Sequence, residues 1–151
     1  MTQAVGGTSL RLTAEDGADL EIISAAMQDA LVRMSEIAFD AKARRFTLQA
    51  RRFRWESEKA GPPYERVHAV LAFESILSVK SRHVRRDASR ALASILSITF
   101  DASGEPPGGT VRILLAGGGE IALEAECLDA LLIDVGQPWR TPRRPYHTGA
   151  D

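Results

Sequence analysis

Hydrophobic and polar positions alternate along much of the chain, and a period of two residues predicts β-strands. Beyond a short strand at residues 10–13, seven segments have this pattern or a continuous apolar run. They are residues 30–39, 44–56, 64–73, 76–81, 91–100, 111–116 and 120–125. A change of phase within 30–39 indicates a bulge or a helix-to-strand transition, and the first half of 91–100 also fits a helix. Gly117, Gly118 and Gly119 join the last two segments as a tight hairpin.

Two further segments have helical spacing. Leu20, Ile23 and Met27 follow Asp16 and Asp19, either of which can cap a helix, so a helix is predicted at residues 18–28.

The second predicted helix covers residues 128–135. Its apolar residues recur at i, i+3, i+4 and i+7, and a glycine and a proline after them supply a stop. They are Leu128, Leu131, Leu132 and Val135, followed by Gly136 and Pro138.

The segment 44–56 is both strand-like and strongly basic. Phe46, Leu48 and Ala50 share one strand face, whereas Phe53 and Trp55 have the opposite parity. Because one extra residue exchanges the two faces of a strand, we predict a β-bulge at Arg51 and Arg52 that returns both sets to the core and points the arginines outward.

Seven successive strands followed by a helix predict an α+β fold of mainly antiparallel strands, arranged as a pleckstrin-homology-like barrel or a sandwich. The N-terminal helix is an addition to that plan. A two-layer α+β sheet with both helices on one face is the alternative. Residues 1–136 are predicted to form a single domain, and residues 137–151 a tail rich in proline and arginine in which Trp139 can dock.

Composition fits this picture. The 151 residues are 44% hydrophobic and 26% charged, as in an ordinary globular protein. The longest apolar runs are too short for a membrane-spanning helix, and the N-terminus lacks the pattern of a signal peptide, so we expect a cytoplasmic protein. The single cysteine, Cys127, cannot form an internal disulfide.

The net charge of −1 conceals a basic centre, because residues 33–90 hold fourteen Lys and Arg against seven acids. Such a surface attracts the phosphates of nucleic acids or of lipid headgroups, and Phe53 and Trp55 can stack on bases if they are exposed. The predicted binding residues are Arg44, Arg45, Arg51, Arg52, Arg54, Lys80, Arg82, Arg85 and Arg86. The competing interpretation is that the arginines form a solvated strand face and the aromatic residues belong to the core.

Catalytic chemistry has weaker support. Cys127 precedes the predicted second helix, where the helix dipole can lower the pKa of a thiol, but a small packing residue is the commoner role. Glu124 and Glu126 form an acidic pair whose second member also suits the cap of that helix. His68 lies in an apolar strand and fits a structural role. We therefore expect no cofactor and no metal.

Four segments together resemble the bacterial family called domain of unknown function 2948. They are 20–30 ending in Gln28-Asp29-Ala30, Arg52-Phe53-Arg54-Trp55-Glu56, Gly117-Gly118-Gly119-Glu120-Ile121 and Glu124-Ala125-Glu126-Cys127. The resemblance implies a small bacterial cytoplasmic protein and brings no activity with it.

Three functions follow from these patterns. The first is a non-catalytic module that binds a protein partner, or itself, through an exposed sheet edge or barrel groove. The second is binding of an anionic polymer or headgroup by residues 44–90. The third is an enzyme that uses Cys127 or the pair Glu124 and Glu126.

Overall fold

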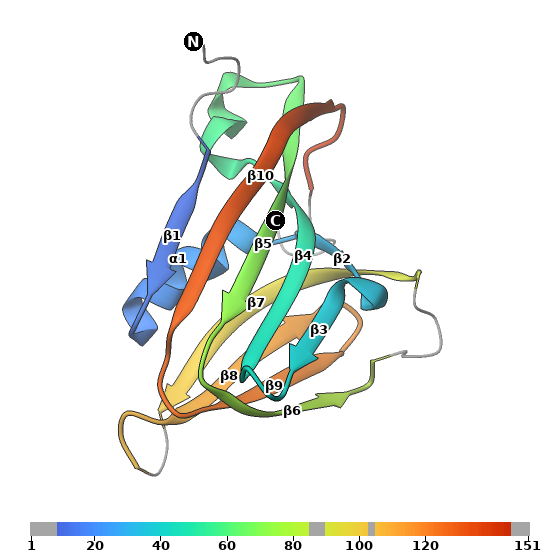
Figure 1. Ribbon diagram of the computed structural model, residues 1–151. Coiled ribbons are helices and arrows are strands. Elements are labelled where there is room, and N and C mark those ends of the chain that lie inside the picture. Colours follow the sequence, from blue (N-terminus) through green and yellow to red (C-terminus); the bar gives the residue numbers. More distant parts are fainter. Residues whose placement is uncertain (1–8, 85–89, 103–104, 146–151) are drawn as a thin grey trace.

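The computed structural model describes residues 9–84, 90–102 and 105–145. In these ranges the chain forms ten strands, one α-helix and two 3₁₀ turns, and the strands join in one antiparallel sheet (Figure 1). The elements are β1 (Arg11–Ala14), α1 (Gly17–Met27), β2 (Leu31–Arg33), η1 (Met34–Glu36), β3 (Ile37–Asp40), β4 (Arg45–Phe53), η2 (Trp55–Ala60), β5 (Tyr64–Phe73), β6 (Ile76–Arg82), β7 (Leu92–Ala102), β8 (Gly109–Leu115), β9 (Glu120–Ala125) and β10 (Ala130–Thr141).

The sheet folds over itself into two layers (Figure 1). One layer has the order β1-β10-β5-β4, with β3 paired to the first half of β4, and the other has the order β7-β8-β9-β6. The short strand β2 joins the layers, because Leu31 pairs with Arg51 of β4 and with Ser94 of β7. The long strands therefore enclose one core.

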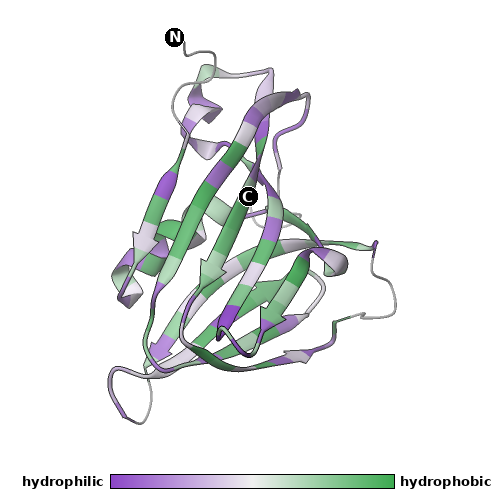
Figure 2. Ribbon diagram, in the orientation of Figure 1, coloured by the Kyte–Doolittle hydropathy of each residue, from purple (hydrophilic) through white to green (hydrophobic). Residues whose placement is uncertain are grey.

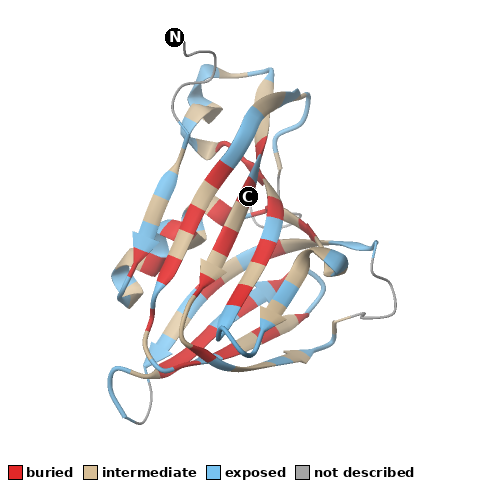
Figure 3. Cartoon of the chain, in the orientation of Figure 1, coloured by how far each residue is buried: buried red, intermediate tan, exposed pale blue. Residues whose placement is uncertain are grey.

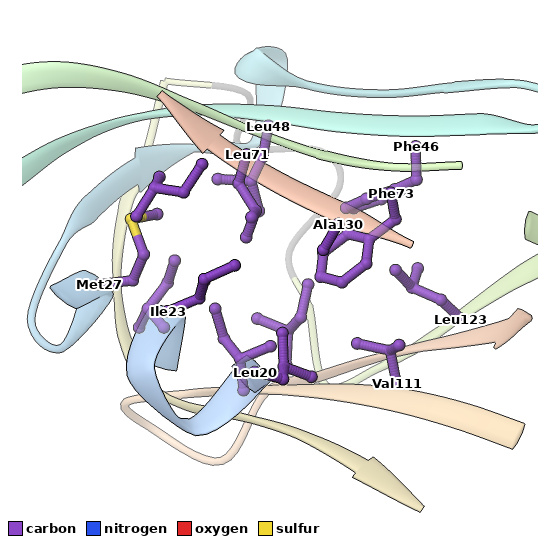
Figure 4. Close-up of a cluster of buried hydrophobic side chains, with 14 of the residues drawn as sticks. Leu20, Ile23, Met27, Phe46, Leu48, Leu71, Phe73, Val111, Leu123 and Ala130 are labelled. Atoms are coloured by element: carbon purple, nitrogen blue, oxygen red, sulfur yellow. The ribbon is translucent and has the colours of Figure 1, made fainter. Parts of the chain in front are cut away.

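Alternation along the strands fills this core. Buried and more exposed residues take turns along β4, β5 and β10 (Figure 3), and hydrophobic residues recur along the same strands (Figure 2). Side chains from both layers meet in a single cluster that includes Leu71 and Leu123 (Figure 4). Burying a leucine contributes about 1.5–3 kcal/mol, so such a cluster is the main source of stability.

The N-terminal helix is confirmed. The side chain of Asp16 accepts a hydrogen bond from the Asp19 N–H at 2.8 Å and so caps α1. Leu20, Ile23 and Met27 are fully buried and point from α1 into the core (Figure 4). At 11 residues α1 is too short to cross a membrane, and no helix in the described ranges is long and apolar enough to do so.

The strands of the sequence analysis are also present, including β1, β7 and the β8–β9 hairpin. The change in the phase of the apolar pattern after Ala30 arises because the 3₁₀ turn η1 separates β2 from β3.

The predicted C-terminal helix is wrong, and the α+β class with its pleckstrin-homology-like barrel is wrong with it. Residues 130–141 form β10, a strand that lies between β1 and β5. Leu132 and Asp134 point inward while Leu131 and Ile133 are half-buried on the outer face. A strand that is apolar on both faces produces helical spacing by chance, because its apolar run is continuous. The alternative with two helices on one face is excluded by the same strand.

The predicted bulge in β4 is also wrong. From Phe46 to Phe53 each residue of β4 pairs with one residue of β5 without a shift in register. The regular alternation continues through Arg52, which occupies an inward position. Beyond the predicted domain limit at residue 136, β10 continues to Thr141, and Trp139 contacts His68 with ring centroids 4.7 Å apart.

Candidate binding site

The exposed arginines at the start of β4 are paired with carboxylates. Arg44 Nη1 lies 2.8 Å from Glu126 Oε1, and Arg45 Nε lies 2.7 Å from Glu74 Oε2. The bond to Glu74 raises the pKa of Arg45. An anionic ligand at this end would therefore compete with carboxylates that are already in place.

Arg52 is fully buried and lies at the centre of an ionic network. Its Nε and Nη2 donate to the two oxygens of Asp134 at 2.7 and 2.8 Å, and its Nη1 and Nη2 donate to the two oxygens of Glu56 at 3.0 and 2.6 Å. A further bond from Nη1 to the Phe53 carbonyl completes the set. We call Arg52, Glu56 and Asp134 the buried ionic network. Arg52 and Asp134 are buried, whereas the side chain of Glu56 is 38% exposed, so this structural element keeps its cation away from solvent.

The electrostatics of the network follow from its hydrogen bonds. Burial by itself disfavours charge on Arg52 and on Glu56, but the bonds between them, and that from Arg52 to Asp134, outweigh it. The pKa of Arg52 is consequently raised and the pKa of Glu56 is lowered. Both groups therefore stay charged at neutral pH.

Arg51 and Arg54 are engaged in the same way. Arg51 Nη2 lies 3.1 Å from Glu36 Oε2, and the buried Arg54 is paired with Glu65. Each of the five predicted arginines between residues 44 and 54 thus has a carboxylate partner.

The aromatic residues of this segment are part of the packed structure. Phe53 is fully buried, and Trp55 contacts it edge-on with centroids 4.6 Å apart. The indole Nε1 of Trp55 donates to the Gln28 carbonyl at 3.0 Å. This favours the core interpretation over stacking on bases.

Lys80 and Arg82 differ from the arginines of β4. They lie on the exposed outer face of β6, in the second layer, and form no ion pair with any residue in the ranges that the structure describes. Arg85 and Arg86 lie outside the described residues. Binding of a nucleic acid or an acidic lipid by residues 44–90 stays a prediction.

The candidates for catalysis are not gathered around a common centre. Cys127 is half-buried and free of disulfides. Thr110 Oγ1 donates to Glu124 at 2.5 Å, while Glu126 pairs with Arg44. Within the described residues no cluster of three or more His, Cys, Asp and Glu side chains could hold a metal ion. An enzyme that uses these residues stays a prediction.

An apolar cleft opens where the two layers come together at β3 and β6. It has a volume of about 330 Å³, within the range of about 300–1,000 Å³ that is usual for ligand sites. We call it the edge cleft, and it is lined by Met34, Ser35, Ile37, Phe39, Phe46, Val79, Ser81, Val84 and Ile121.

The local sequence sets the position of β3. Asp40 Oδ1 accepts hydrogen bonds from the N–H groups of Lys42 and Ala43, both at 3.1 Å, which makes a tight turn into β4. This turn lays β3 against the first half of β4 only. β3 lies beside β4 (Figure 1), and Ile37 and Phe39 of β3 line the cleft.

The other side of the cleft is β6. Ser75 has a positive φ of 60° and turns the chain from β5 in the first layer to β6, which pairs with β9 in the second. At its start the Ile76 N–H donates to the Arg44 carbonyl at 2.9 Å. This bond ties the start of β6 to the turn between β3 and β4. No backbone hydrogen bond joins β6 to β3 itself in the described part of the chain, so the cleft is held together at one end only.

A family model described as a protein of unknown function (DUF2948) matches residues 10–147. The chain belongs to the DUF2948 family. The match runs from before β1 to past the end of β10, so the edge cleft and the buried ionic network both lie within the DUF2948 domain. No curated protein and no solved structure matches the chain.

Sequence patterns missed the two main features of this DUF2948 chain. The residues of the cleft come from η1, β3, β4, β6, β9 and the segment after β6, and only the fold brings them together. One local signal was present for the network: Arg52 has the same strand parity as Phe46 and Leu48, which marks an inward position.

Proposed function

We propose that this protein is a non-catalytic binding module that takes an extended segment of a protein partner in the edge cleft. The observation that carries the proposal is an apolar cavity bordered by β3 and β6, whose sides towards the cavity pair with no other strand among the described residues. Strand edges bind extended peptides through backbone hydrogen bonds, and adjacent pockets select alternate side chains.

A peptide suits the cleft better than a small apolar molecule. The free sides of β3 and β6 present N–H and C=O groups as well as apolar side chains such as Ile37 and Val79. An apolar molecule would fill the cavity but leave the backbone groups to water, whereas an added strand satisfies both. The pairing of the β4 arginines with carboxylates makes an anionic polymer a weaker candidate.

The proposal is tested by selecting random peptides displayed on phage against the purified protein. Peptides that are enriched are synthesised, labelled and measured by fluorescence anisotropy. Val79→Arg puts a charge into the apolar cleft, and we expect it to weaken binding by about tenfold or more. Val79→Ser provides a second variant if the arginine prevents folding, which circular dichroism monitors.

Ile22→Arg is the matched control, because Ile22 is 58% exposed on α1 and the substitution makes the same change in charge. We expect Ile22→Arg to bind like the wild type. Failure to enrich any peptide, or equal binding by Val79→Arg and the wild type, would contradict the proposed function.

A further inference from the structure

β6 is the last strand of the sheet order, and its two faces differ in chemistry. After an irregularity at Leu77, β6 pairs regularly with β9 from Ser78 to Arg82. Val79 and Ser81 line the edge cleft, whereas Lys80 and Arg82 line a polar groove on the outer face, which Ser81 also borders. A strand added to β6 would present its own side chains alternately to these two environments.

Among the residues that the structure describes, neither Lys80 nor Arg82 forms an ion pair with a carboxylate. Arg82 stands opposite Glu120 of β9, but Glu120 accepts from Arg112 at 2.7 Å. Glu124, further along β9, accepts from Thr110. The groove thus holds three cations, Lys80, Arg82 and Arg112, against two carboxylates, Glu120 and Glu124, and this excess of one positive charge lies beside the free side of β6.

We propose, on the basis of the proposed function, that the partner segment adds to β6 as a strand and carries acidic residues at alternate positions. Its apolar side chains enter the edge cleft beside Val79, and its acidic side chains pair with Lys80 and Arg82. Opposite charges on directly facing residues of neighbouring strands are favourable and like charges are unfavourable. The ligand class is thus a peptide with alternating apolar and acidic residues.

A second copy of β6 does not meet these requirements. The sequence of β6, Ile-Leu-Ser-Val-Lys-Ser-Arg, contains two cations and no acid. Antiparallel pairing of two such strands would bring cations together. Lysine on an edge strand is also a known protection against pairing with other copies. The same two charges therefore oppose self-association and favour an acidic partner.

The inference is tested by repeating the peptide selection on the double variant Lys80→Glu/Arg82→Glu. We expect the wild type to enrich peptides with Asp or Glu at every second position, and the double variant to enrich Lys or Arg at those positions. Arg11→Glu/Arg140→Glu is the matched control, because both residues are exposed, lie on β1 and β10 and give the same change in charge. We expect it to enrich the same peptides as the wild type.

Affinities give a second measure. A peptide selected on the wild type is expected to bind the double variant several-fold to about tenfold more weakly at low salt, since two favourable pairs become two unfavourable ones. The difference should shrink as salt is added. Amide hydrogen exchange of β6 should slow in the complex, as backbone pairing requires.

The outcomes separate this inference from the proposed function. The inference would be overturned if the enriched peptides need Val79 for binding but show no preference for acidic residues. It would also be overturned if the double variant enriches the same peptides as the wild type. Either result would leave the proposed function standing. Binding without slower exchange in β6 would overturn strand addition. Enrichment of no peptide that depends on Val79 would remove the proposed function and the inference together.

Discussion

The guanidinium of Arg52 has five N–H groups, and the oxygens of Asp134, Glu56 and Phe53 accept all of them. Asp134 also accepts from the Leu10 N–H at 2.9 Å, which holds the segment before β1 against β10. Burying a charge is tolerated only when such partners are present, and removing one partner of a buried pair is strongly destabilising.

Asp134→Ala should therefore lower the free energy of unfolding by about 3 kcal/mol, near the lower end of the range for broken buried pairs because Glu56 still holds Arg52. Urea titration followed by circular dichroism measures this loss. Asp101→Ala is the control, because Asp101 is an exposed residue of β7, and a change within about 0.5 kcal/mol is expected for it. Equal losses for the two variants would show that the network does not stabilise the fold.

At the scale of elements, the sequence predicted those whose signal is local. The helix α1 was found because Leu20, Ile23 and Met27 lie on one face and Asp16 caps it. β10 was missed because both of its faces are apolar, so its residues also fit a helix. The inward position of Arg52 was missed because its partner Asp134 lies 82 positions away, and no local pattern indicates such a partner.

Two leucines distinguish the strand from the helix that spacing suggested. Leu132→Ala should cost about 2–5 kcal/mol, because Leu132 is fully buried in β10. Leu131→Ala should cost about 1 kcal/mol, since its side chain lies half-buried on the outer face. Midpoints of urea unfolding compare the variants. In an amphipathic helix both leucines would face the core, so similar losses would contradict the strand.

At the scale of the whole molecule, two layers share one core and are joined by β2 and by the Ile76–Arg44 backbone bond. The edge cleft exists because these connections hold β3 and β6 near each other without pairing them along their length. Sequence analysis predicted a pleckstrin-homology-like barrel or a sandwich closed by a C-terminal helix, which is wrong, and binding through an exposed edge or groove, which stays a prediction. Which edges are free depends on strand order, which local patterns do not encode.

A shared core predicts one cooperative transition. Both tryptophans, Trp55 and Trp139, lie in or next to the layer of β4, β5 and β10, whereas far-ultraviolet circular dichroism follows all the strands. We expect urea unfolding curves from tryptophan fluorescence and from circular dichroism to coincide. Separate transitions would mean that the layers unfold independently.

The buried ionic network also constrains how related sequences can change. Replacing Arg52 alone would leave the buried Asp134 without its cation, and replacing Asp134 alone would leave a buried cation without two of its five hydrogen bonds. Positions 52 and 134 should consequently vary together among members of the family, passing from charged to apolar as a pair. Members that retain both charges can be aligned on them, even where their loops and strand ends have diverged.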